Sequence, residues 1–185
     1  MYDSKRLQYI TSLIFNAIKN NPDVKVHFLI NHDAILNHLY NNGEQYDLIN
    51  IDHHHDIFYH GKIDDQGNIS NWVYWLGKNN QIVSYYWIGN PTSDKFNGKY
   101  LVPQGEVILP HDEEEVIREL PFFYRYTNLI DFSLTKQKFD EIFIVLSPEY
   151  IPPKFHHLFY MLQEIYEINT GELCPVDQSR YLKGE

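Results

Sequence analysis

The pattern of apolar and polar positions along the chain predicts four helices, and the acidic stretch at 111–115 is typical of the start of a fifth. Apolar side chains recur at helical spacing along residues 4–20 and again along residues 155–171. Two shorter segments, 35–39 and 71–76, show part of the same pattern. We therefore expect an amphipathic helix near each end of the chain and two short helices between them.

Five apolar runs have the length and the residue types of strands. They cover residues 24–30, 46–51, 81–88, 107–109 and 141–146. The first run alternates apolar residues with polar or small ones, whereas the run from 46 is mostly apolar, as in a central strand. Because helical segments separate several of these runs, their order predicts an α/β domain with parallel strands.

Metal-capable side chains follow directly after the apolar run at 46–51. The run is followed by the sequence Asp-His-His-His-Asp, from Asp52 to Asp56. Side chains alternate along an extended segment, so Asp52, His54 and Asp56 are expected on one side and the other two histidines on the opposite side. A mixture of carboxylate and imidazole suits Mn²⁺, Fe²⁺ or Zn²⁺ better than Mg²⁺ or Ca²⁺. The alternative is a solvated loop, or a tract that binds metal adventitiously.

Two further strands also end in candidate ligands. His32 follows the run at 24–30, and Glu149 follows the run at 141–146. The carboxyl ends of parallel strands share one edge of a sheet, which is where ligands bind in open α/β folds. We therefore expect five ligands to converge there: His32, Asp52, His54, Asp56 and Glu149.

Length, composition and charge narrow the class of protein. The 185 residues suit one domain over residues 1–185, with a polar tail from about residue 172. A formal net charge of -10 argues against a nucleic-acid partner and favours a cationic ligand. The single cysteine excludes an internal disulfide, and no apolar stretch reaches membrane-spanning length. These features predict a soluble, cytoplasmic protein without a membrane partner, and they leave homo-oligomer formation open.

The order of these motifs resembles the arginase and deacetylase superfamily. Its members carry a histidine after one strand, Asp-x-His-x-Asp after the next, and a Ser-x-Asp motif after a late strand. Here these would be His32, the motif at 52–56, and Ser147-Pro148-Glu149. Ile-Asp-His-His-His-Asp, Asn71-Trp72-Val73 and Leu-Ser-Pro-Glu-Tyr look most like the short relatives that include the peptide arginases. The resemblance covers roughly residues 24–165, but its specific part is confined to these motifs.

The resemblance implies a reduced, three-layer fold in which helices flank a mostly parallel sheet. It also implies hydrolysis of a C–N bond by a metal-activated hydroxide, converting arginine side chains of a peptide or a small guanidinium substrate to ornithine and urea. The implied cofactor is Mn²⁺, as one or two ions, with Fe²⁺, Co²⁺ or Zn²⁺ as alternatives. Asp56 would accept the proton of the water, and a histidine or acid would assist the leaving amine. The candidates for that help are His55, His60 and Asp33, and the candidates for substrate binding are Asn71 and Trp72.

One departure from the superfamily pattern leaves alternatives open. The late motif usually offers a second acid two residues after the first, whereas this chain has Ile151 at that place. A second metal would lose a ligand, so both one and two ions remain compatible with the sequence. The alternative functions are a metal-dependent deacetylase or another amidohydrolase, a non-catalytic metal- or peptide-binding module, and a purely structural domain.

Overall fold

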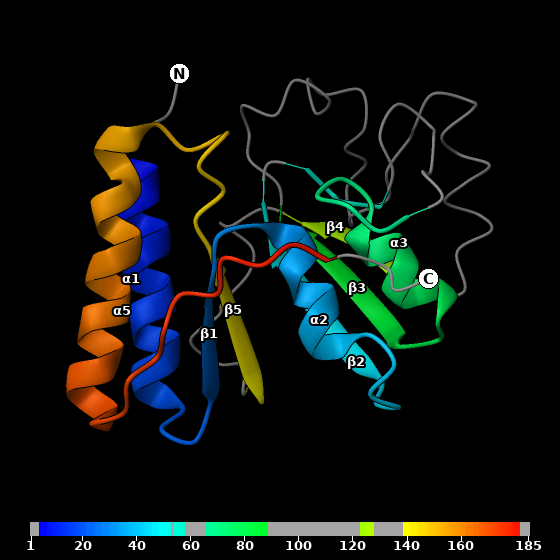
Figure 1. Cartoon of the computed structure of the whole chain (residues 1–185), viewed down its shortest axis with the longest axis horizontal. Helices are drawn as coiled ribbons and strands as arrows, with labels where there is room; N and C mark the ends of the chain where they lie inside the picture. Colours follow the sequence, from blue (N-terminus) through cyan, green and yellow to red (C-terminus); the bar gives the residue numbers. More distant parts are fainter. Residues whose placement is uncertain (1–3, 53, 58–65, 89–122, 128–138, 182–185) are drawn as a thin grey trace. The chain divides into compact units, whose positions relative to one another are not determined.

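The computed structural model describes residues 4–52, 54–57, 66–88, 123–127 and 139–181. Figure 1 shows these elements in sequence colours. In chain order they are α1 (Ser4–Asn20), β1 (Lys25–Leu29), the 3₁₀ turn η1 (His32–Ala34), α2 (Ile35–Leu39), β2 (Tyr46–Ile51), α3 (Trp72–Lys78), β3 (Ile82–Ile88), β4 (Phe123–Thr127), β5 (Glu141–Val145), the 3₁₀ turn η4 (Pro153–Phe155) and α5 (His156–Thr170).

These bounds confirm the four predicted helices and four of the five predicted strands. The predicted strand at 107–109 and the predicted helix start at 111–115 lie outside the described residues. β4 was not predicted. All the described strand pairs are parallel: β1 with β5, β2 with β3, and β3 with β4. The chain therefore has the mixed α/β character with parallel strands that its sequence predicts. None of the described helices is long and apolar enough to cross a membrane.

The chain divides into two compact units. Unit 1 comprises residues 1–34 and 133–180, and unit 2 comprises residues 35–132 and 181–185. In unit 1, α1 and α5 contact each other and share a core with β1 and β5 (Figure 1). The aromatic centre of this core is Phe28, which is 1% exposed and meets the ring of Phe159 edge-on at 5.6 Å.

The segment after α5 supports β1 of unit 1. Gly171 ends α5 with a left-handed backbone (φ 73°), which reverses the chain. Asp177 then bonds to β1 on either side of Leu29: its carbonyl accepts from Ile30 N–H at 2.9 Å, and its N–H donates to Phe28 O at 2.8 Å. Part of the predicted polar tail thus pairs with a strand.

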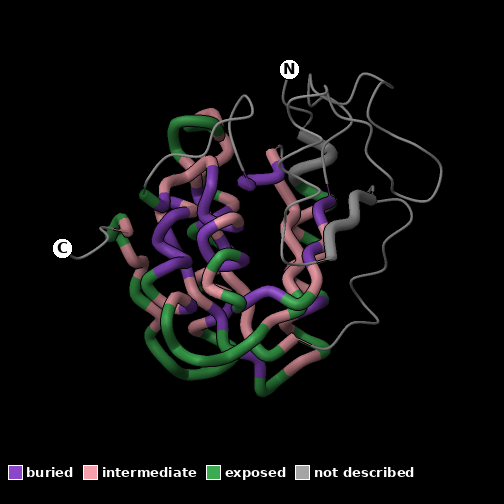
Figure 2. Tube along the Cα trace, turned by 90° about the vertical axis from the view of Figure 1, so that its right-hand side faces the viewer, coloured by how far each residue is buried: buried purple, intermediate pink, exposed green. Residues whose placement is uncertain are grey.

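Unit 2 contains the order β2-β3-β4 with the helices α2 and α3. Its buried positions include alternate residues of β3, where Tyr85 and Trp87 have no exposed surface; the buried stretches are purple in Figure 2. α3 contacts both α2 and β3, and its Val73 and Leu76 are completely buried. The close packing of α3 matters for the site, because the loop between β2 and α3 carries Asp56.

Candidate metal centre

The Asp-His-His-His-Asp motif forms a loop. β2 ends at Ile51, so the strand alternation on which the predicted placement rests does not extend to Asp52, His54 and Asp56. The backbone N–H of His54 donates to Oδ1 of Asp52 at 3.4 Å, a local turn contact. Asp56 has a left-handed backbone (φ 51°), which aspartate tolerates better than most residues. The turn brings the second aspartate of the motif back toward the first.

Asp56 is buried and held on three sides. Its Oδ2 accepts hydrogen bonds from the indole N–H of Trp72 at 2.8 Å and from the side-chain amide of Asn50 at 3.3 Å. Its backbone carbonyl accepts from the N–H of Val73 at 3.1 Å. The side chain is 3% exposed. The first turn of α3 and the strand β2 therefore fix this carboxylate in place.

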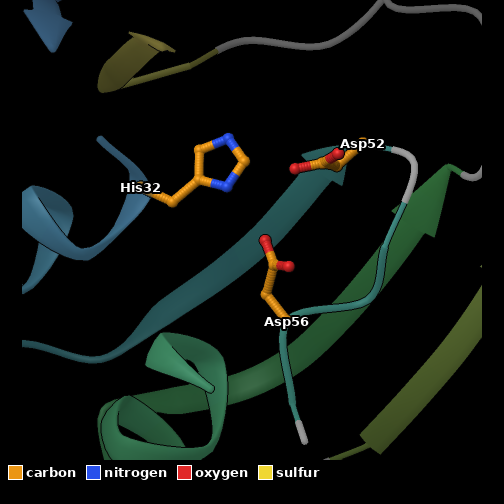
Figure 3. Close-up of side chains that lie close together, drawn as sticks. All are labelled: His32, Asp52 and Asp56. Atoms are coloured by element: carbon orange, nitrogen blue, oxygen red, sulfur yellow. The ribbon is translucent and has the colours of Figure 1, made fainter. Parts of the chain in front are cut away.

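The carboxylates of Asp52 and Asp56 face the same space in unit 2 (Figure 3). One oxygen of each lies within 4.8 Å of the other. Burial raises the pKa of Asp56 well above 3.8, and the nearby Asp52 carboxylate raises it further, while the hydrogen bonds from Trp72 and Asn50 act in the opposite direction. Two carboxylates this close repel each other when both are ionised, so a cation between them is favourable.

The histidines of the motif differ in their surroundings. His55 is 4% exposed, and its Nδ1 accepts a hydrogen bond from the N–H of Ile57 at 3.0 Å. Its ring meets Trp87 edge-on at 5.3 Å, and its carbonyl accepts from Tyr85 Oη at 2.7 Å. His55 is thus part of the packed interior of unit 2, and its catalytic role stays a prediction. His54 is partly exposed, and its role as a ligand also stays a prediction.

In unit 1, His32 and Ser147 face each other across the ends of β1 and β5. His32 Nε2 and Ser147 Oγ are 2.9 Å apart. Ser147 has a left-handed backbone (φ 48°), and its N–H donates to the carbonyl of Ile30 at 3.0 Å, so the pairing of the two strands continues to this point. Asp33, in η1, is 4% exposed.

Glu149 lies on the surface of unit 1, and its Oε1 is 3.3 Å from Arg180 Nη2. Both side chains are more than half exposed, so this ion pair adds little stability. Glu149 and the Asp52–Asp56 pair lie in different units. Its role as a ligand stays a prediction.

The predicted substrate-binding residues are buried in unit 2. Asn71 is 1% exposed; its Oδ1 accepts from the N–H of Asn68 at 2.8 Å, and its Nδ2 donates to the carbonyl of Gln66 at 3.1 Å. Trp72 is 2% exposed and donates to Asp56. Both residues shape the loop before α3, whereas contact with a substrate stays a prediction. His60, the remaining catalytic candidate, lies outside the described residues.

Sequence reasoning missed the contributions of Asn50 and Tyr85. The amide of Asn50 donates to Asp56 and, at 3.0 Å, to Tyr85 Oη. One signal was available for Asn50: it is the polar residue in the apolar end of β2, two positions before Asp52 and hence on the same side of the strand. Tyr85 carries no such signal, because a tyrosine in a strand is usually a packing residue.

Comparison of the chain with protein-family models, with curated proteins and with solved structures finds no match. The resemblance to arginases and deacetylases therefore stays a prediction that rests on the motif residues. The chemical argument for a metal centre stands separately on the Asp52–Asp56 pair, in which Asp56 is buried and Asp52 partly exposed.

Proposed function

We propose that this protein is a metal-dependent hydrolase of C–N bonds, with its ion held by Asp52 and Asp56 and by the further ligand His32 that the order of the sequence motifs predicts. The observation that carries the proposal is the pair of close carboxylates at the carboxyl end of β2, one of which has its pKa raised by burial and further by the other carboxylate. A fold retains such a repulsive pair at a cost in stability, and a divalent cation removes that cost.

The donor set fits a transition-metal ion. Within unit 2, one carboxylate oxygen of Asp52 lies within 4.8 Å of one of Asp56, and Figure 3 labels both side chains; His32 joins them as the ligand that the order of the sequence motifs predicts. Two carboxylate oxygens and one imidazole nitrogen suit Mn²⁺, Fe²⁺, Co²⁺ or Zn²⁺. Within unit 1, Nε2 of His32 is 2.9 Å from Ser147 Oγ. Such an outer hydrogen bond commonly orients a ligating histidine.

When bound, the ion would supply a Lewis acid that lowers the pKa of a water molecule to near neutrality. The chain's own part is to orient the ligands: Trp72 and Asn50 hold Asp56, and Ser147 holds His32. The acidic pair and the net charge of -10 favour a cationic substrate group. For a guanidinium group, the water oxygen would join the central carbon and the bond to the chain nitrogen would break. Both water protons would end on that nitrogen, which becomes the ammonium group of the side chain, and the central carbon would leave as urea.

The finer assignment rests on the sequence resemblance. We propose that the substrate is an arginine side chain of a peptide, as in the peptide arginases, and that the product is ornithine. We propose likewise that the parallel strands belong to a reduced, three-layer arginase-like fold. Parallel pairing of every described strand supports this, as do candidate ligands after β1, β2 and β5.

Metal content tests the proposal most directly. Protein purified without chelators and loaded with Mn²⁺ should retain about one ion per chain on elemental analysis, or about two if a second site exists. Asp52→Asn should lose the ion, because it removes one charge of the pair while preserving shape. Asp47→Asn is the matched control: Asp47 lies on the same strand, is exposed, and bonds to Ser84 away from the site. A chain that retains no ion, or an Asp52→Asn variant that binds as well as the wild type, would refute the site.

Activity is tested on the loaded protein. An arginine-containing peptide should release urea, and Asp52→Asn should abolish this release while Asp47→Asn should not. Acetate release from an acetylated peptide, without urea release, would reassign the site to amide hydrolysis. An ion bound without turnover, across Mn²⁺, Fe²⁺, Co²⁺ and Zn²⁺, would identify a metal- or peptide-binding module.

A further inference from the structure

Gly67 lies where the fold leaves little room for a side chain. It is buried in the segment 66–71 that leads into α3, which we call the pre-α3 loop, and its φ is not positive. The space around it, rather than its backbone, therefore favours glycine. A Cβ atom at this position would lie 2.5 Å from Cδ1 of Leu36 and 3.1 Å from Cδ1 of Tyr181. The missing side chain thus lets Leu36 and the ring of Tyr181 pack directly on the loop backbone.

Tyr181 also contacts Tyr40, the residue that follows α2. Their rings meet edge-on with centroids 5.7 Å apart. Tyr181 is half-buried, and this burial raises the pKa of its hydroxyl, with the nearby Tyr40 raising it further. Tyr40, Gly67 and Tyr181 all belong to unit 2, whereas Arg180 belongs to unit 1. The chain therefore returns to unit 2 at Tyr181, and this residue packs against both the end of α2 and the pre-α3 loop.

Hydrogen bonds tie Gly67 to the start of α3. The residues on either side of it both bond to the side chain of Asn71: the N–H of Asn68 donates to Oδ1 at 2.8 Å, and the carbonyl of Gln66 accepts from Nδ2 at 3.1 Å. Asn71 is 1% exposed and directly precedes Trp72, the first residue of α3. A shift of Gly67 would therefore strain both bonds to Asn71 and move the first turn of the helix.

We propose that Tyr181 is a positioning residue: its ring holds the pre-α3 loop in place and thereby sets where Trp72 meets Asp56. The inference rests on the proposed metal centre and adds to it a support from the end of the described chain. The indole of Trp72 donates to the Asp56 carboxylate at 2.8 Å, so a displaced loop would move this donor away. Tyr181 acts through Gly67 and Trp72 and takes no direct part in the proposed chemistry.

Hydrogen exchange on the metal-free, full-length protein tests whether Tyr181 holds the loop. Backbone N–H groups of residues 66–73 donate hydrogen bonds, including those of Asn68, Ser70, Asn71 and Val73. Tyr181→Ala should speed exchange in this segment and leave residues 82–88 of β3 unchanged, because the lost packing lies at the loop and at the end of α2. Tyr181→Phe keeps the ring and should exchange like the wild type. Tyr160→Ala is the control and should also exchange like the wild type, because Tyr160 is 49% exposed on α5 in unit 1.

Calorimetric titration with Mn²⁺ tests whether the loop acts on the metal centre. The affinity should be about 10-fold weaker in Tyr181→Ala, the lower end of the loss expected when the outer support of a ligand is removed. It should be unchanged in Tyr181→Phe and in Tyr160→Ala. Recovery with phenylalanine would assign the effect to the packing of the ring rather than to its hydroxyl.

Gly67→Ala provides a second variant if Tyr181→Ala does not fold, as judged by circular dichroism. Its methyl group should displace the completely buried Leu36 and the ring of Tyr181, so exchange in residues 66–73 should again become faster. Unchanged exchange there in both variants would overturn the inference. Equally faster exchange in β3 would also overturn it, by showing a general loss of stability, and so would wild-type Mn²⁺ affinity in a variant whose loop exchanges faster. A wild-type protein that binds no Mn²⁺ would instead refute the proposed function, and the exchange result would still decide whether Tyr181 holds the loop.

Discussion

Asp56 combines a backbone turn with a buried carboxylate that lowers the stability of the metal-free protein. Its left-handed backbone turns the chain after β2, and its carboxylate is buried beside Asp52. Burial and the neighbouring charge both raise its pKa, so the folded, metal-free protein holds the proton of Asp56 more tightly than the unfolded chain does. This linkage lowers stability as pH rises from about 3.8 toward the raised pKa, and the loss persists at higher pH.

Replacing Asp56 by Asn should therefore stabilise the metal-free protein at neutral pH. Asn has nearly the same shape, keeps an acceptor oxygen for Trp72, and carries no charge to repel Asp52. We expect the free energy of unfolding at about pH 7 to rise, because folding then no longer has to keep an ionised carboxylate buried beside Asp52. Urea unfolding after chelator treatment measures this difference.

The pH dependence distinguishes charge from packing in that experiment. The advantage of Asp56→Asn should shrink as pH falls toward 3.8, because the wild-type carboxyl is then protonated in both states. The exposed Asp47→Asn variant should show no comparable gain. If Asp56→Asn were less stable than wild type both at about pH 7 and near pH 3.8, the protein itself would stabilise the ionised Asp56 carboxylate, without a cation.

At the scale of elements, Gln81 joins the end of α2 to the start of β3. The side chain is 3% exposed. Its Nε2 donates to the carbonyl of Leu39 and, at 2.9 Å, to Asn42 Oδ1; its Oε1 accepts from Asn41 N–H at 3.0 Å and from Asn79 Nδ2 at 2.7 Å. The side-chain amide of Gln81 thus hydrogen-bonds to groups in both the turn after α2 and the turn after α3.

Gln81→Ala should destabilise the protein by about 1–3 kcal/mol, because it leaves buried backbone and amide groups without their partner. Thermal unfolding measures the change. Gln45→Ala is the matched control: Gln45 is exposed and makes one bond to Asn80 O, so its loss should stay within roughly 0.5 kcal/mol. Mn²⁺ binding should survive in both variants. A Gln81→Ala protein as stable as Gln45→Ala would show that the turns after α2 and α3 do not depend on the Gln81 side chain for their stability.

For the whole molecule, the question is whether the two units unfold together. Unit 1 combines both terminal regions of the chain, and unit 2 is formed mainly from the middle. The sequence prediction was a single domain, and each unit alone has a small core. The chain contains built-in probes, because all three tryptophans lie in unit 2 and the only cysteine, Cys174, lies in unit 1.

We predict that the two probes report one transition. Tryptophan fluorescence follows unit 2. Thiol labelling follows unit 1, because Cys174 is partly buried, its pKa is raised mainly by burial, and its Sγ donates to Val26 O at 3.2 Å. The midpoints in urea should coincide, since neither small core is expected to persist alone. Separate midpoints would show that the units are independent domains and that the single-domain prediction is wrong.

The sequence by itself determined the helices, most of the strands and the place of the Asp-His-His-His-Asp motif after β2. These features are local, since burial on one face imposes a period of 3.6 residues on a helix and of two on a strand. Parallel pairing followed from helices alternating with strands. β4 was not predicted, because its sequence Phe-Tyr-Arg-Tyr-Thr lies in a stretch without a clear alternation of apolar and polar residues.

Only the tertiary structure decided how the motif is used. Strand alternation predicted that Asp52, His54 and Asp56 share one side, but β2 stops at Ile51 and a left-handed turn redirects Asp56. The donors to Asp56 lie 6 and 16 residues away in the chain, a spacing that no period encodes. Their convergence depends on where α3 packs against β3, and therefore on the burial of the whole of unit 2 rather than on any one segment.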